Sequence, residues 1–125
     1  MTDTLQSTRK KGSRGEKLAC DYLKENNFSI LEQNWRSGKY GEIDIIALDN
    51  KTNELVFVEV KSRSTSIEEA KELVTKSKQS KLYKLANSYL YLNKKENPAC
   101  RFDVIAIKIT NENIEMEHIR DAFYP

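Results

Sequence analysis

Two neighbouring segments in the middle of the chain, residues 41–48 and 55–61, are strongly apolar, and charged residues occupy only a few of their positions. A short polar stretch, residues 50–53, separates them. This spacing predicts two strands joined as an antiparallel hairpin. Aligning Ile45 with Val58 produces one uninterrupted apolar face, and a shift by one residue would push charge into it. The residues of that face are Ile43, Ile45, Ala47, Val56, Val58 and Val60.

The remaining segments show the spacing of helices or of strands. Ser13 and Glu16 have capping-box spacing ahead of a helical apolar stripe, which predicts that the first helix begins near Arg14. The predicted elements are a helix over 14–25, a strand over 28–35, the hairpin, helices over 67–73 and 76–92, and strands over 102–109 and 114–119. The order α-β-β-β-α-α-β-β predicts an α/β fold, with a mixed β-sheet flanked by helices. We expect a flexible basic tail over residues 1–11 and a single domain over 12–125.

Four charged residues interrupt the apolar pattern of the hairpin. In the predicted register Asp44 lies opposite Glu59, and Glu42 lies opposite Lys61. Charged groups inside apolar strands cost free energy unless they are paired or bind a metal. Two carboxylates that face each other also repel, and a divalent cation between them removes the repulsion. The hairpin therefore predicts a metal site, and a structural ion pair is the alternative.

The residue types of this site suit the hydrolysis of phosphodiester bonds. Magnesium is held by a few carboxylates, waters and substrate phosphate, so Asp44 and Glu59 are the expected ligands of Mg²⁺ or Mn²⁺, with the Val60 carbonyl as a further ligand. The Lys61 ammonium on the same face can orient the attacking water and stabilise transition-state charge. Glu42 is expected to support the site, either by pairing with Lys61 or from the outer shell.

Basic residues gather in two segments, although the 21 Lys and Arg residues against 19 Asp and Glu residues leave a net charge of only +2. Such patches contact phosphate backbones, and a solvated helix face is the alternative for each. We expect nucleic acid to be contacted by Lys10, Lys11, Arg14, Arg36, Lys39, Arg63, Lys78 and Lys81. No apolar run has the length of a membrane span or the form of a secretion signal, which predicts a cytoplasmic location and no membrane partner. Cys20 and Cys100 are too few for a zinc site and are expected to be buried as small apolar residues.

The spacing from Asp44 to Glu59-Val60-Lys61 resembles the PD-(D/E)XK nuclease pattern. Other segments extend the resemblance, namely Gly15-Glu16, Gly41-Glu42-Ile43-Asp44, Val56-Phe57-Val58-Glu59-Val60-Lys61-Ser62-Arg63, Ala86-Asn87-Ser88-Tyr89-Leu90 and Arg101-Phe102-Asp103-Val104. Together they resemble the YraN family of uncharacterised bacterial proteins over about residues 13–123.

This resemblance implies a restriction-endonuclease-like core similar to that of archaeal Holliday-junction resolvases. It implies that Asp44, Glu59 and Lys61 are catalytic and that Glu16 is the acid contributed by the first helix to the metal site. The capping box with Ser13 is an equal alternative for Glu16. Structured or branched DNA is the implied substrate. Junction-cutting relatives act as dimers, which leaves a homodimer open.

The function predicted on these grounds is a divalent-metal-dependent endonuclease. A nucleic-acid-binding protein with the nuclease fold but without useful catalysis is the second hypothesis, and a small protein-interaction module is the third.

Several other polar or aromatic residues admit a functional and an ordinary structural interpretation. Gln79 precedes Tyr83 with a spacing found in some related nucleases, but a solvated glutamine beside a packing tyrosine is the commoner arrangement. Asp103 is expected to pair with Arg101 or a lysine. His118 has no neighbouring partner cluster in the sequence and is expected to be structural. For Trp35 and Tyr40, stacking on an exposed base and core packing are both open.

Overall fold

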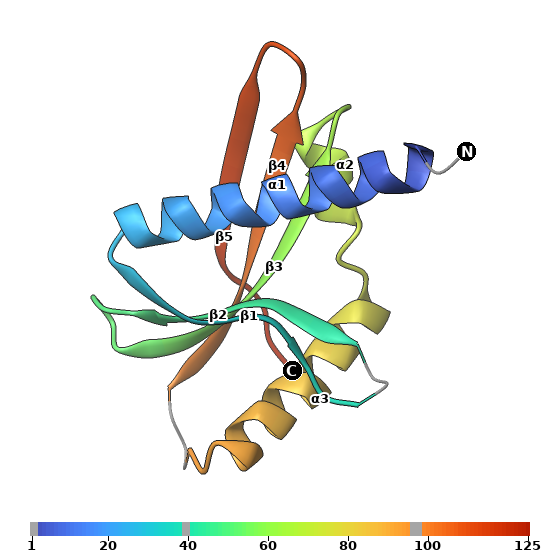
Figure 1. Ribbon diagram of the computed structural model, residues 1–125. Helices are drawn as coiled ribbons and strands as arrows, with labels where there is room; N and C mark the ends of the chain where they lie inside the picture. The colour runs from blue at the N-terminus through green and yellow to red at the C-terminus, as the bar shows by residue number, and fades with distance from the viewer. Residues whose placement is uncertain (1–2, 39–40, 96–98) are drawn as a thin grey trace.

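The chain folds into one sheet of five strands with helices against it (Figure 1). The computed structural model describes residues 3–38, 41–95 and 99–125, with side chains from Arg14 onward. The elements are α1 (Asp3–Glu25), β1 (Phe28–Arg36), β2 (Glu42–Asp49), β3 (Glu54–Arg63), α2 (Ile67–Glu72), α3 (Lys76–Leu92), β4 (Cys100–Ile109) and β5 (Ile114–Phe123). The strands lie in the order β1-β2-β3-β4-β5. Only β3 and β4 are parallel among these neighbours, which makes the sheet mixed and confirms the predicted α/β class and element order.

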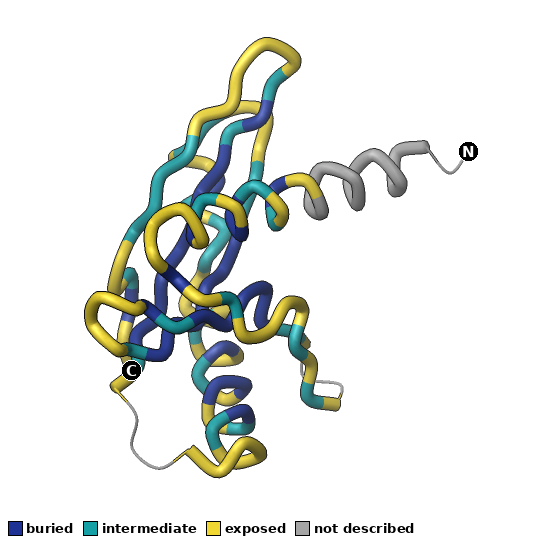
Figure 2. The backbone as a smooth tube through the Cα atoms, turned by 60° about the vertical axis from the view of Figure 1, so that its left-hand side comes forward, coloured by how far each residue is buried: buried dark blue, intermediate teal, exposed yellow. Residues whose placement is uncertain are grey.

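Helices α1 and α3 cover opposite faces of the sheet. Leu23 of α1 packs with Val58 in one buried cluster, whereas Leu85 of α3 packs with Phe57 in another. Figure 2 shows the buried residues concentrated along the central strands between the two helices. A parallel β3–β4 pair needs a crossover connection, and α2 with α3 supplies it. Within the described segments no helix is both long and apolar enough to cross a membrane.

The hairpin register predicted from the apolar face is confirmed over most of its length. β2 and β3 pair from Asp49 with Glu54 to Ile45 with Val58, and the described residues of the two strands form no further pair beyond that point. The predicted apolar face is wrong at Ile43 alone, because Ile43 packs in the cluster on the α3 side while Ile45 packs on the α1 side. The change of face coincides with the point at which the two strands stop pairing.

The first helix begins at Asp3, and the start predicted near Arg14 is wrong. Residues 3–11, which we expected to be a flexible tail, form its first turns, and no proline in the segment prevents this. Ser13 therefore lies inside α1 and does not begin it, which removes the capping box as the explanation for Glu16.

A buried arginine side chain, that of Arg101, holds three strands together at one end of the sheet. The Arg101 side chain is only 7% exposed and lies 2.8 Å from Asp49, 2.8 Å from Glu54 and 2.9 Å from Asp103. These contacts join β4 to β2 and β3. The predicted pairing of Asp103 with Arg101 is confirmed. Burial alone would raise the pKa of Asp103, but hydrogen bonds from His118 and Arg101 outweigh it and lower that pKa.

His118 links this buried cluster to α1, so it has the structural role expected of it, although with partners that the sequence did not reveal. Its Nε2 lies 2.7 Å from Asp103 Oδ2, and its Nδ1 lies 2.9 Å from the Tyr22 hydroxyl. The partners were not visible in the sequence because Tyr22 lies on a different element, far along the chain. This chain of hydrogen bonds ties α1 to β5 and β4.

Candidate metal centre

Asp44 lies where β2 and β3 separate. The Val60 N–H donates to Asp44 Oδ2 at 2.8 Å. In the continued register Val60 would face Ile43, so this side-chain bond takes the place of a backbone bond between the strands. The Asp44 residue is 8% exposed, and so is Glu59. Two acidic residues are thus held almost out of water at the point where the hairpin opens.

The pKa of Asp44 is raised to about 8. Burial is the largest cause, followed by a hydrogen bond and charge repulsion from Glu59, while the Val60 N–H and the Lys61 charge act in the opposite direction. Near neutral pH the pair therefore favours keeping a proton between the two carboxyl groups. A bound cation supplies the same positive charge and removes the need for that proton.

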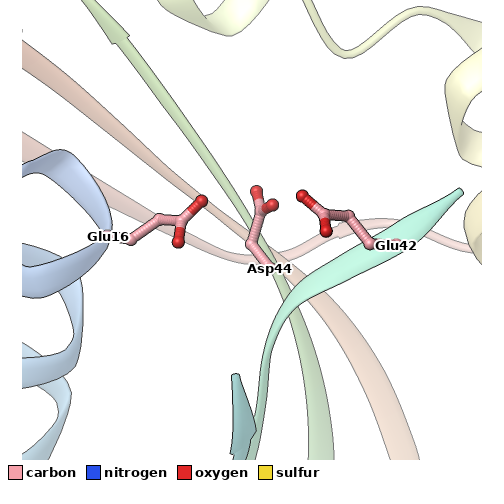
Figure 3. A group of neighbouring side chains, drawn as sticks. All are labelled: Glu16, Glu42 and Asp44. Carbon is pink, nitrogen blue, oxygen red and sulfur yellow. The ribbon is translucent and has the colours of Figure 1, made fainter. Parts of the chain in front are cut away.

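Glu16 and Glu42 converge on Asp44 from different elements (Figure 3). One carboxylate oxygen of each residue lies within 4.8 Å of the others. Burial and the charge of Asp44 raise the pKa of Glu16, and a hydrogen bond from Asn34 opposes that rise. Glu42 accepts a hydrogen bond from Arg36 Nε at 3.1 Å, so its partner is Arg36, while Lys61 lies 3.8 Å from Glu59.

Two small features bring Glu16 to this point. A Cβ atom added at Gly15 would lie 3.3 Å from Ser62 Oγ, which shows how closely α1 approaches β3 beside the site. Asn34 in β1 adopts a φ of 51°, a conformation that asparagine tolerates better than most residues, and its side chain bonds to Glu16. We did not single out Asn34 from the sequence. An asparagine inside an otherwise regular strand pattern was the available signal.

Lysines complete the site. A pocket of about 250 Å³ is lined by Gly41, Glu42, Asp44, Glu59, Lys61, Lys78, Lys81, Leu82 and Leu85. Gly41 has a φ of 116°, which glycine adopts without the strain that a side chain would add. β2 contributes acids to this pocket, and α3 contributes Lys78 and Lys81.

The donor set fits a hard divalent cation. Glu16, Glu42 and Asp44 offer carboxylate oxygens only, and Mg²⁺ and Mn²⁺ prefer oxygen ligands. Glu59 lines the same pocket but is not part of this group of three. These residues, with Glu59 beside Asp44, are the ones that could hold an ion, together with waters and a substrate phosphate. Val60 holds Asp44 in place through its N–H.

The other residues predicted to have a functional role lie in different places. Gln79 donates to the Val74 carbonyl at 3.2 Å and does not line the acidic pocket. Arg14 lines a separate hollow beside Ser64 and Asn111, and Arg63 is exposed at the end of β3. Lys39 and the side chains of Lys10 and Lys11 fall outside the described residues.

Several aromatic residues and cysteines considered in the sequence analysis pack against the interior of the protein. Trp35 packs edge-on against Tyr89 with ring centroids 5.3 Å apart, and Tyr83 packs against Phe102 at 5.0 Å. Tyr40 lies outside the described residues. Cys20 is buried as predicted, whereas Cys100 is half-buried.

Comparison with known proteins places the chain among relatives of similar length. The sequence profile described as "Uncharacterised protein family UPF0102" matches residues 15–107. A UPF0102 protein of Geotalea daltonii is 48% identical over 114 residues, covering 90% of this chain and 87% of the relative. One from Francisella tularensis subsp. novicida is 47% identical and covers 90% and 92%, and one from Syntrophus aciditrophicus is 41% identical and covers 98% and 92%.

Proposed function

The chain belongs to the uncharacterised family UPF0102, which is the YraN family that its motifs resemble. We propose that it is a divalent-metal-dependent endonuclease. The proposed reaction is hydrolysis of phosphodiester bonds in structured or branched DNA. The proposed cofactor is Mg²⁺ or Mn²⁺.

One observation carries this proposal, the gathering of Glu16, Glu42 and Asp44 within 4.8 Å beside a pocket that also contains lysines. Acids concentrated in this way destabilise the metal-free fold, as the raised pKa of Asp44 indicates. Stability alone gives no reason to place a fourth acid, Glu59, next to Asp44. A site for a cation and an anionic substrate gives such a reason.

Each residue has a defined task in the proposed reaction. A bound Mg²⁺ would supply charge neutralisation at the phosphoryl group and activation of a water. The Val60 N–H donates to one oxygen of Asp44 and holds the side chain in place, so the other oxygen would be available to bind the ion. The Lys61 ammonium, 3.8 Å from Glu59, can orient the attacking water and stabilise negative charge as it develops.

A DNA substrate is supported by the basic residues around the pocket. Lys78 and Lys81 line it from α3, and Arg14 is exposed two positions before Glu16. Contacts of this kind bind the phosphate backbone without reading its sequence. Recognition of the DNA by shape, as in branched substrates, is consistent with that chemistry.

Cleavage assays test this function. Purified protein with Mg²⁺ or Mn²⁺ is incubated with four-way junction, flap and linear duplex DNA, and EDTA serves as the metal-free control. We expect cleavage only with metal, and a loss of roughly 100-fold or more in rate for Glu59→Gln. Glu115→Gln, an exposed glutamate on β5, is the matched control and should retain the wild-type rate. Cleavage that persists in EDTA, or that Glu59→Gln leaves unchanged, contradicts the proposal.

A second function, nucleic-acid binding without catalysis, is favoured by one feature of the site. Glu59 is not among the three acids that converge, although the proposed chemistry needs it near the ion. A non-catalytic protein would bind DNA with an affinity that falls steeply with salt, and would show no metal-dependent cleavage.

A further inference from the structure

The pocket brings together two groups of like charge, one acidic and one basic, and the charges within each group repel. Asp44 and Glu59 are buried acids that repel each other. Lys61 and Lys78 form the corresponding basic pair, from β3 and from the first turns of α3. Two ammonium groups that share one pocket repel each other by the same Coulomb argument that applies to two carboxylates.

The direction of the pKa shift of Lys78 agrees with this repulsion. The pKa of Lys78 is lowered, first by the neighbouring Lys61 ammonium and then by burial, while Glu59 and Asp44 act to raise it. An anion between Lys61 and Lys78 would relieve the repulsion, just as a cation relieves that between the acids. A phosphate beside a divalent cation satisfies both groups at once.

A purely structural role does not account for Lys78. The first turn of α3 contains no acidic residue, and a lysine near a helix N-terminus opposes the helix dipole. The residue is exposed and is not part of either buried cluster, so packing does not require it. The aliphatic residues of the same pocket wall, Leu82 and Leu85, perform the packing.

We propose that Lys78 binds a nonbridging phosphate oxygen of the DNA next to the metal, together with Lys61, and so positions the phosphate for cleavage. This assignment rests on the proposed function and narrows it, because it makes one lysine of the α3 surface part of the substrate site. Lys84, on the same helix but not in the pocket, then belongs to the general solvated surface.

The test compares Lys78→Met, Lys78→Arg and the matched control Lys84→Met in three measurements. These are the Mn²⁺ affinity without DNA, the affinity for a fluorescent four-way junction in EDTA, and the kinetics of cleavage with Mn²⁺. We expect Lys78→Met to weaken DNA binding and to lower kcat/KM by roughly 10-fold to 100-fold. The same change should tighten Mn²⁺ binding by about threefold to tenfold, because a positive charge facing the acids is removed.

The opposite signs of these effects separate a phosphate-binding role from damage to the fold, which would weaken both ligands. Lys78→Arg keeps the charge and should restore most of the DNA affinity, and Lys84→Met should resemble wild type throughout. If Lys78→Met matches Lys84→Met in Mn²⁺ and DNA affinity, the assignment of Lys78 is wrong while the nuclease proposal stands. If the wild-type protein binds neither Mn²⁺ nor the junction, both proposals fail.

Discussion

Asp44→Asn is expected to make the metal-free protein more stable at pH 9 by about 3 kcal/mol, and to abolish its stabilisation by Mg²⁺ or Mn²⁺. Asparagine is nearly isosteric with aspartate, so its Oδ1 can still accept the Val60 hydrogen bond, while its amide can donate to Glu59. A repulsive pair thus becomes a hydrogen-bonded one. In a chain of this size the gain corresponds to an increase of roughly 10 °C in Tm.

The pH dependence follows from the direction of the shift. The folded protein holds the Asp44 proton up to about pH 8, whereas the unfolded chain releases it near its ordinary pKa of 3.8. Between these values the folded state binds more protons, so the contribution of Asp44 to the stability of the metal-free wild type falls as pH rises. The difference between Asp44→Asn and wild type should therefore be near zero at pH 4, grow through neutral pH and level off above about pH 8.

Thermal unfolding from pH 4 to pH 9, with and without Mn²⁺, measures both effects. Asp21→Asn is the control, since Asp21 is exposed on α1 and makes only an i,i+4 ion pair with Lys17. It should change stability little and leave the Mn²⁺ response intact. An Asp44→Asn protein that is less stable than wild type at pH 9 would show that Asp44 has a structural role. Stabilisation by Mn²⁺ that persists in this variant would show that the ion does not need Asp44.

Arg101→Met should lower the free energy of unfolding at pH 7 by about 3–5 kcal/mol. Methionine fills much of the same volume, so the loss reflects the carboxylates that stay buried without a cation. Asp49 and Asp103 are 1% and 0% exposed, and Arg101 contacts both. Urea unfolding at pH 7 gives the value directly.

Two variants distinguish charge from packing at this position. Arg120 is about half exposed and lies 3.4 Å from Asp49, so Arg120→Met should cost less than about 1 kcal/mol. Adding Asp103→Asn to Arg101→Met removes one buried carboxylate that has lost its arginine partner, and should recover part of the lost free energy of unfolding. A loss below 1 kcal/mol for Arg101→Met, or no recovery in the double variant, would contradict the proposed role of the buried charges.

The hairpin register could be predicted from the sequence because a shift by one residue would push charge into the apolar face. Ile45 and Val58 pair as that register requires, and Asp44 and Glu59 follow as buried acids at the end of the ladder. The order of helices and strands was equally accessible, since each element carries its own period and its own stop signal. The type and order of these elements depend on local sequence patterns, which can be identified in a single sequence.

Contacts between distant segments could not be predicted in the same way. The close approach of Gly15 to Ser62 and the left-handed Asn34 bring Glu16 to Asp44, and each depends on how α1 docks on the sheet. The link from Tyr22 through His118 to Asp103 has the same origin. The early start of α1 was not predicted for another reason. The capping-box spacing of Ser13 and Glu16 suggested a helix start, but Ser13 lies in the interior of α1.

Calorimetric titration of Mn²⁺ into wild type and Asp44→Asn, at pH 8 and without DNA, tests the metal site most directly. We predict a saturable isotherm for the wild-type protein, with protons released on binding because Asp44 must ionise, and no binding above the heat of dilution for Asp44→Asn. Identical isotherms for the two proteins, or no binding to wild type, would contradict the assignment of the acidic cluster as a metal centre.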